Sequence, residues 1–174
     1  KLQHFAPCKR PRGDTLRHSP PVRVLWPPRA TPPASDNAGA LVLEVGEARG
    51  RLLLLADVDG AVEDSLLPGG EVAVLKVSHH GAAAASGAAF LARVRPRLAL
   101  LSVGARNRFG HPAVGVLERL AAAGAAVRRT DRSGAIWIEW SARGVTELDW
   151  RRGLPPTPGA APAAGTGPRL PRRR

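Results

Sequence analysis

The sequence predicts an α/β fold in which helices cover a sheet of buried strands. Short apolar runs bounded by Gly, Pro or Asp alternate with segments of helical periodicity, as in strand–helix–strand units. The 174 residues are 44% apolar but only 4% aromatic, and they include no Tyr or Met. We therefore expect one globular domain whose core consists of Ala, Leu and Val.

The apolar runs predict the strands. The last of them alternates apolar side chains after a turn at 131–134, so it should border the core. The others are short enough to be buried on both faces. The expected strands are residues 22–26, 40–45, 51–56, 72–77, 98–103, 126–129 and 135–140.

The segments between these runs predict the helices. Asp59 and Ser86 are residue types that cap helix N-termini, Pro112 fits a first helical turn, and Gly124 fits the position after a helix end. The expected helices are residues 61–67, 87–94 and 112–123.

The two ends of the chain differ in composition from the middle. The net charge is +12, but the first 35 residues and residues 151–174 carry +6 each, and the segment between them is formally neutral. We expect an irregular basic segment at 1–21, a folded domain at 22–150 and a disordered Pro-, Ala- and Arg-rich tail at 151–174. Basic flanks of this kind predict salt-sensitive, unspecific attraction to polyanions.

The cysteine and hydropathy patterns exclude several classes. The only cysteine, Cys8, cannot form an internal disulfide, and no Cys/His spacing fits a zinc finger. The longest aliphatic run, 52–56, is far too short to span a bilayer, and the N-terminus lacks an apolar signal core. The chain as written is expected to be soluble, and its start at Lys1 rather than Met fits a piece of a longer protein.

Polar residues follow three of the predicted strands, at the strand ends where open α/β sheets bind ligands. At the first junction, Asp57 and Asp59 follow a run of four leucines in a predicted strand. Asp59 fits a helix cap. Asp57 fits either a cap or a carboxylate that binds a metal, a cation or water, since a buried unpaired charge is costly.

The second junction places His79, His80 and Gly81 after a strand. Imidazole suits Zn, Mn or Fe, and a histidine beside a strand-end aspartate forms a natural metal pair. Because strand side chains alternate between faces, one of the two histidines should face the site while the other supports it. A surface or structural histidine pair is the alternative.

The third junction, residues 102–112, is rich in hydrogen-bond donors. If Pro112 opens a helix, His111 lies beside free backbone N–H groups, where phosphate binds readily. A solvated turn with a cap is the alternative. The expected phosphate-binding residues are Arg106, Asn107 and Arg108.

Together these junctions resemble the carboxy-terminal metallo-β-lactamase-like domain of the ComEC family of DNA-uptake proteins. The segments that carry the resemblance are LLLLADVDGAVEDSLL, VAVLKVSHHG, LALLSVGARNRFGHP and VRRTDRSGAIWI, which occur in register within about residues 22–140. The resemblance implies the carboxy-terminal half of an αββα sandwich, an incomplete metallo-β-lactamase-like domain.

The resemblance also implies roles for particular residues. Asp57 matches an aspartate that bridges two metal ions, and His79 or His80 matches a late histidine ligand. His111 matches the histidine of a Gly-His-Pro signature, and the resemblance implies that it contacts the scissile phosphate or transfers a proton. Two Zn or Mn ions in the full-length domain could clamp the attacking and leaving oxygens of a phosphodiester.

By resemblance, the full-length protein is a metal-dependent nuclease that acts on DNA during uptake, at the extracytoplasmic face of the bacterial cell membrane. Its implied partners are single-stranded DNA, bound without sequence preference, and the membrane channel portion of the same protein. The resemblance implies no small-molecule organic cofactor.

One family motif does not occur in this sequence. The family's main metal motif, His-x-His-x-Asp-His, should lie before residue 22, where His4 and His18 are isolated. Ala56 also replaces a usual Gly. The remaining ligands are too few for a tight binuclear site, so we expect weak or no metal binding and little or no activity from this chain.

Two other functions fit the same residues. A non-catalytic remnant could use the basic flanks as a polyanion-binding module. A stand-alone metallo-hydrolase of a small phosphate ester would use the 102–112 loop for its substrate.

Overall fold

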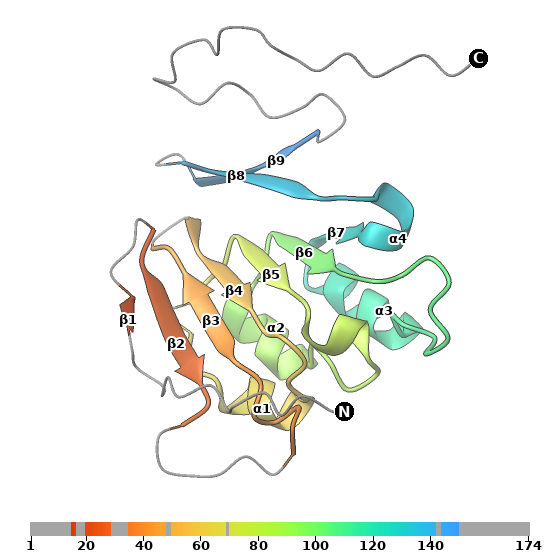
Figure 1. Ribbon diagram of the computed structural model, residues 1–174, viewed down its shortest axis with the longest axis horizontal. Coiled ribbons are helices and arrows are strands. Elements are labelled where there is room, and N and C mark those ends of the chain that lie inside the picture. The colour runs from red at the N-terminus through yellow and green to blue at the C-terminus, as the bar shows by residue number, and fades with distance from the viewer. Residues whose placement is uncertain are drawn as a thin grey trace, which may run out of the picture.

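The computed structural model describes residues 15–16, 20–28, 35–47, 50–68, 70–141 and 144–149. Within these ranges the chain forms one seven-stranded sheet, in the order β1 to β7, and a separate two-stranded hairpin, β8–β9 (Figure 1). The strands are β1 (Thr15–Leu16), β2 (Val22–Trp26), β3 (Val42–Val45), β4 (Leu52–Leu54), β5 (Val74–Lys76), β6 (Leu98–Leu101), β7 (Ala126–Arg129), β8 (Trp137–Ser141) and β9 (Gly144–Leu148).

The sheet is antiparallel in its first half and parallel in its second. Strands β1 to β4 pair antiparallel, whereas β4, β5, β6 and β7 pair parallel. Leu54 of β4 pairs with Lys76 of β5, which pairs with Leu100 of β6. The carboxyl ends of these three neighbouring strands therefore meet at one edge of the sheet.

Helices connect the parallel strands and cover one face of the sheet. The connecting helices are α1 (Gly60–Ser65), α2 (Ala88–Val94) and α3 (Val114–Ala122), and a short helix, α4 (Thr130–Ser133), follows β7. Each connection leads from one parallel strand to its immediate neighbour, always in the same direction across the sheet. Because such connections are nearly always right-handed, they place their helices on the same face of the sheet. In agreement, α1 contacts α2 and α2 contacts α3 (Figure 1).

The main core lies between this face and the helices. Leu53, Leu75 and Leu101 point into it from successive strands and are fully buried. Phe90 of α2 is the largest fully buried side chain among the described residues, and Leu120 of α3 packs in the same cluster. The expected core of small aliphatic residues is confirmed, with one phenylalanine added.

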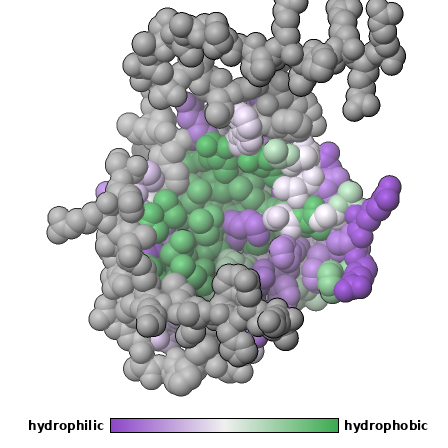
Figure 2. Space-filling model, viewed as in Figure 1, coloured by the Kyte–Doolittle hydropathy of each residue, from purple (hydrophilic) through white to green (hydrophobic). Residues whose placement is uncertain are grey.

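The opposite face of the sheet is also apolar, and none of α1 to α3 covers it. The strand register aligns Leu43, Leu54, Lys76 and Leu100 in one row across this face. These leucines are half-buried, and Figure 2 shows apolar side chains gathered over the central strands on the side of the molecule turned to the viewer. At the β7 end, Arg128 forms an ion pair with Glu147 of the hairpin at 2.9 Å.

Most expected elements are present, with shorter bounds. Helix α3 begins at Val114, after an extended Ala113 cap, so Pro112 precedes the helix rather than opening it. Ser86 is not the cap of α2, because Gly87 holds that position without a side-chain bond. Asp59 does cap α1, accepting a hydrogen bond from the Val62 N–H at 3.0 Å.

Three further expectations need correction. Residues 15–16, within the segment expected to be irregular, pair with β2. The turn expected at 131–134 is largely helical, in α4. Strand β8 pairs with β9 in the hairpin rather than joining the main sheet. The tail at 151–174 lies outside the described residues, and among those described no helix is long and apolar enough to cross a bilayer.

Candidate functional site at the carboxyl ends of the parallel strands

The three junctions predicted from the sequence come together at one edge of the sheet. Asp57 follows β4, His79 and His80 follow β5, and the loop that ends at His111 follows β6. The backbone N–H of His79 donates to the carbonyl of Ala56 at 2.9 Å, which ties the second junction to the first. The adjacency follows from the parallel pairing of the strands.

Asp57 and His80 bring the first and second junctions together. The Nε2 atom of His80 lies 3.6 Å from Oδ1 of Asp57, and both side chains are about half exposed. The other ring nitrogen, Nδ1, lies 2.7 Å from the carbonyl oxygen of Ser102. Because a carbonyl only accepts hydrogen bonds, Nδ1 must carry a proton, so in the neutral ring Nε2 offers a lone pair toward Asp57. Two acceptors that face each other in this way are suited to bind a cation between them.

His79 takes a different position from His80. Its ring meets that of His111 edge-on, with 5.9 Å between the ring centroids. The φ angles of His79 and His80 are 42° and 55°, in the left-handed region that few side chains adopt. The two histidines thus lie in a tight turn after β5, where the face alternation of a strand does not apply.

Gly81 allows the second and third junctions to approach closely. Its φ is 81°, and a Cβ atom there would lie 2.7 Å from side-chain atoms of Leu101 and Pro112. The carbonyl of Gly81 accepts a hydrogen bond from the Ala113 N–H at 2.9 Å. The glycine after the histidine pair therefore packs against the proline after His111.

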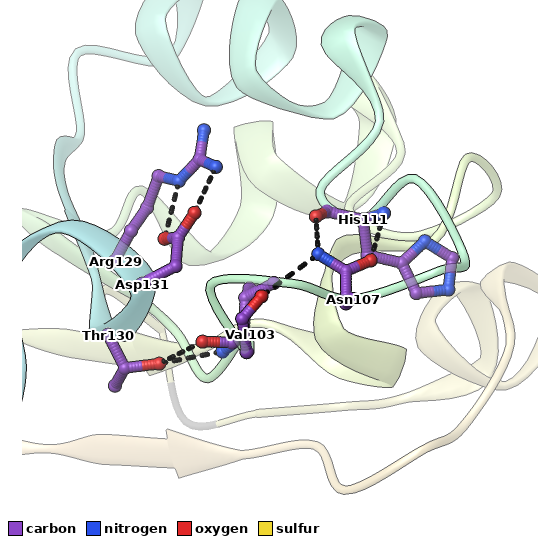
Figure 3. Close-up of polar contacts among 7 residues, drawn as sticks. Val103, Asn107, His111, Arg129, Thr130 and Asp131 are labelled. Carbon is purple, nitrogen blue, oxygen red and sulfur yellow. Dashed lines mark hydrogen bonds and ion pairs between the residues drawn. The ribbon is translucent and has the colours of Figure 1, made fainter.

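Asn107 holds the third junction in shape. Its amide nitrogen donates to the carbonyls of Gly104, at 3.2 Å, and His111, at 2.8 Å, and its oxygen accepts from the His111 N–H at 2.9 Å. Figure 3 shows these bonds crossing the loop, with the imidazole of His111 clear of them. The expected role of Asn107 was phosphate binding, and its amide atoms are engaged with the loop backbone.

The base of this loop is fixed to α4. The Thr130 hydroxyl accepts from the Val103 N–H at 2.7 Å and donates to the Val103 carbonyl at 2.8 Å (Figure 3). Beside it, Arg129 and Asp131 form a largely buried ion pair with two hydrogen bonds, of 3.0 and 2.6 Å. The Arg129 guanidinium lowers the pKa of the Asp131 carboxyl.

A cavity of about 370 Å³ opens between the second and third junctions. His80 and Asn107 line it, together with Phe109 and His111. Arg106 and Arg108, the other expected phosphate-binding residues, are exposed on the same loop. Phe109 is 68% exposed, and the guanidinium carbon of Arg108 lies 5.3 Å from the centre of its ring.

A buried carboxylate holds the turn that carries His79 and His80. Glu63 of α1 is fully buried and accepts hydrogen bonds from the Ser78 hydroxyl at 2.6 Å and the Ser86 N–H at 2.7 Å. Burial raises the pKa of Glu63, and the bonds from Ser78 and Ser86 oppose that shift. Ser78 starts the turn that carries His79, so Glu63 anchors this turn to α1.

Lys76 is a second charged group near the site. It ends β5 on the open face, between Leu54 and Leu100, and its Nζ donates to the Val77 carbonyl at 2.9 Å. Burial lowers the pKa of Lys76, and the nearby Asp57 carboxylate acts in the opposite direction. A cation placed here adds to the positive potential near Asp57.

The described residues do not make a complete metal site. Among them, no group of three or more His, Cys, Asp or Glu side chains is placed to hold a metal ion. Asp57 and His80 offer two donors of suitable type, which is half of a four-coordinate shell. These residues fit part of a metal-ligand set, and further ligands are required for tight binding.

Sequence reasoning missed several of these residues. Glu63, Lys76 and Thr130 act through contacts across the fold, which no local pattern shows. Phe109 could have been noticed as an apolar residue directly after Arg108 in an otherwise polar loop.

Comparison with curated proteins gives relatives for most of the chain. It is 33% identical over 135 residues to ComE operon protein 3 of Bacillus subtilis, a match that covers 76% of the chain. It is 37% identical over 114 residues to competence protein ComA of Neisseria gonorrhoeae and 31% identical over 107 residues to Recombination protein 2 of Haemophilus influenzae, covering 63% and 61% of the chain. No profile of a known protein family matches.

The relatives define the class of protein, since all three matches are at least 31% identical and each covers more than half of the chain. The chain belongs to the ComEC family. It spans only 17%, 16% and 14% of the lengths of these three relatives.

Proposed function

We propose that this chain is the carboxy-terminal part of a metallo-β-lactamase-like domain that hydrolyses phosphodiester bonds of DNA during uptake. The observation that carries the proposal is the meeting of Asp57, His80 and His111 at one sheet edge, beside a cavity and two exposed arginines. The family relationship supports DNA as the substrate class, since one relative is named a competence protein and another a recombination protein.

The arrangement of donors supports a role for a divalent metal. The Nε2 lone pair of His80 and the carboxylate of Asp57 face each other at 3.6 Å, and the bond from His80 Nδ1 to Ser102 holds the ring in that orientation. A bound metal would polarise the phosphoryl oxygen and lower the pKa of bound water. Asp57 and His80 would hold it together with ligands from the rest of the protein, and His79 would pack behind His111.

The other residues of the site are suited to the substrate. Arg106 and Arg108 carry the charge that attracts a phosphodiester, and His111 can donate a hydrogen bond or a proton to it. Asn107 acts as a positioning residue, because its three bonds hold the backbone on both sides of these groups.

The open face of the sheet supports the fold assignment. In an αββα sandwich each sheet has helices on its outer face and a second sheet on its inner face. Here one face is covered by helices, and the other presents half-buried leucines around Lys76. Figure 2 shows the apolar character of this face. We assign that face to contact with a second sheet from the remainder of the protein, whose other portion would form the membrane channel.

The first experiment measures hydrolysis of a single-stranded oligonucleotide with Mn²⁺ or Zn²⁺. We expect the 174-residue chain to be inactive or nearly so, since it lacks the His-x-His-x-Asp-His motif. A longer natural protein that includes such a motif should cleave, and Asp57→Ala should abolish cleavage. Asp59→Ala is the matched control, because Asp59 lies two residues away and caps α1.

Two results would contradict the proposal. Cleavage by the longer protein that survives both Asp57→Ala and His80→Ala would remove these residues from the site. Cleavage by the 174-residue chain itself, abolished by Asp57→Ala, would show that the missing motif is unnecessary.

A second candidate function rests on the distribution of charge. Residues 1–35 and 151–174 each carry +6, which supports a module that holds polyanions without catalysis. Deletion of 154–174 should then sharply reduce the salt dependence of DNA binding, while Asp57→Ala should leave it unchanged. The opposite pattern would count against this function.

A further inference from the structure

An exposed aromatic ring stands beside the proposed phosphate site. Phe109 is 68% exposed, whereas Phe90 is fully buried in the core. Single exposed apolar side chains are common on protein surfaces, so the neighbours of Phe109 decide whether it has a role.

The neighbours of Phe109 are the groups expected to contact phosphate. Its ring lies nearly parallel to that of His111, at 19° and 6.0 Å between centroids. The guanidinium of Arg108 lies 5.3 Å from the ring centre, and the ring lines the same cavity as His80 and His111. A flat apolar surface and a set of cationic or hydrogen-bonding groups thus lie within one nucleotide's reach of each other.

We propose that Phe109 is a stacking platform for an unpaired base of single-stranded DNA, which sets the strand against His111 and Arg108. Every base has a π-face, so stacking on an aromatic side chain is tolerant of sequence. In a duplex the base faces are covered by neighbouring pairs, so this platform selects single strands. The inference rests on the proposed function, because it takes the adjacent groups as the phosphate site.

The fold supports a fixed platform rather than an adaptable one. The loop that carries Phe109 is closed by the Asn107 bonds to Gly104 and His111, and its base is held by Thr130. A ring on a fixed backbone segment loses less conformational freedom when a base stacks on it.

The test compares binding of two probes by the full 174-residue chain, in EDTA so that no cleavage occurs. One probe is a short oligo-dT strand, and the other has the same backbone with abasic sites in place of the bases. The basic flanks contact the phosphates of both probes equally, so the ratio of the two dissociation constants isolates the bases. We expect the oligo-dT strand to bind at least about fivefold tighter, as for the loss of one base–aromatic stack.

Variants at Phe109 separate stacking from apolar contact. Phe109→Leu keeps an apolar side chain but removes the π-face, and the ratio should fall to near one. Phe109→Trp should restore it. Leu67→Ala is the control, because Leu67 is another large exposed apolar residue, 70% exposed, and should leave the ratio unchanged.

The outcomes distinguish this inference from the nuclease proposal. A wild-type ratio near one, or a ratio that survives Phe109→Leu, overturns the stacking platform whether or not the longer protein cleaves DNA. A ratio that collapses in Phe109→Leu and returns in Phe109→Trp supports it even if no cleavage is ever found. Binding of a duplex should be unaffected by all three substitutions, and a loss of duplex binding in Phe109→Leu would overturn the selection of single strands.

Discussion

The hydrogen bond between Glu63 and Ser78 should stabilise the domain by an amount that a double-mutant cycle can measure. The cycle consists of Glu63→Leu, Ser78→Ala and the double variant. Glu63→Leu keeps a side chain of similar size but removes the only acceptor that the structure gives the Ser78 hydroxyl, at 2.6 Å. It also leaves the buried N–H of Ser86 without its partner.

The magnitude follows from burial. An unsatisfied buried donor costs about 1–3 kcal/mol, so two of them cost about 2–6 kcal/mol, less whatever is recovered by no longer burying the carboxylate. Ser78→Ala alone should cost about 1.5–3 kcal/mol, the range for a hydrogen bond to a charged group. In the Glu63→Leu background the same change removes an unpaired buried hydroxyl, so it should recover up to about 1–3 kcal/mol of stability. The expected coupling energy is therefore at least about 1.5–3 kcal/mol.

The assay is urea unfolding at pH 7, followed by far-UV circular dichroism, with m-values checked for constancy. Asp64→Ala is the matched control, because Asp64 is the exposed neighbour of Glu63 in the same helix, and it should change stability by less than about 0.5 kcal/mol. Additive single variants, with a coupling below about 0.5 kcal/mol, would refute the idea that Glu63 anchors the histidine turn through Ser78.

Three further changes test the backbone and the titration of the same region. Gly81→Ala should lower the free energy of unfolding in urea by about 2–5 kcal/mol, because alanine is strained in the left-handed region and its Cβ atom would overlap Leu101 and Pro112. An unchanged unfolding midpoint would contradict this close approach. Ala56→Gly should stabilise the domain by up to about 1 kcal/mol in the same assay, because Ala56 has a φ of 49° and glycine removes that strain. The gain is limited because glycine also raises the conformational entropy of the unfolded chain. A clear loss of stability would argue against the left-handed backbone at this position. The raised pKa of Glu63 means that its contribution to stability is complete below its ordinary value of 4.5 and is lost as pH rises through the folded-state pKa. The stability of the wild type relative to Glu63→Gln should therefore be greatest near pH 4 and decline toward neutral pH, and urea midpoints that keep a constant difference would exclude this titration.

Much of the fold follows from local patterns in the chain. Residues 22–26 and 126–129 were expected as strands and are strands with the same bounds. Each apolar run is short and bounded by residues that end strands, and each helix has a local stop signal, so neighbouring residues suffice to place the elements. The three polar junctions could be found in the same way, because each one directly follows an apolar run.

The pairing of distant segments is what local patterns do not contain. The hairpin of β8 and β9 stands apart from the main sheet, although β8 has the alternation of a core-bordering strand. Face alternation was the wrong guide for His79 and His80, because both lie in a left-handed turn after the strand ends. Strand periodicity applies only while the backbone is extended.

The sequence by itself determined which strands precede the polar junctions, and therefore which residue types stand at the site. The tertiary structure decided which partner each of those residues contacts. It turned His80 toward Asp57 through a bond to Ser102, and it engaged the amide of Asn107 with its own loop. The physical reason is that burial and hydrogen bonding depend on what lies across the fold, and only the parallel pairing of β4, β5 and β6 brings these junctions within contact.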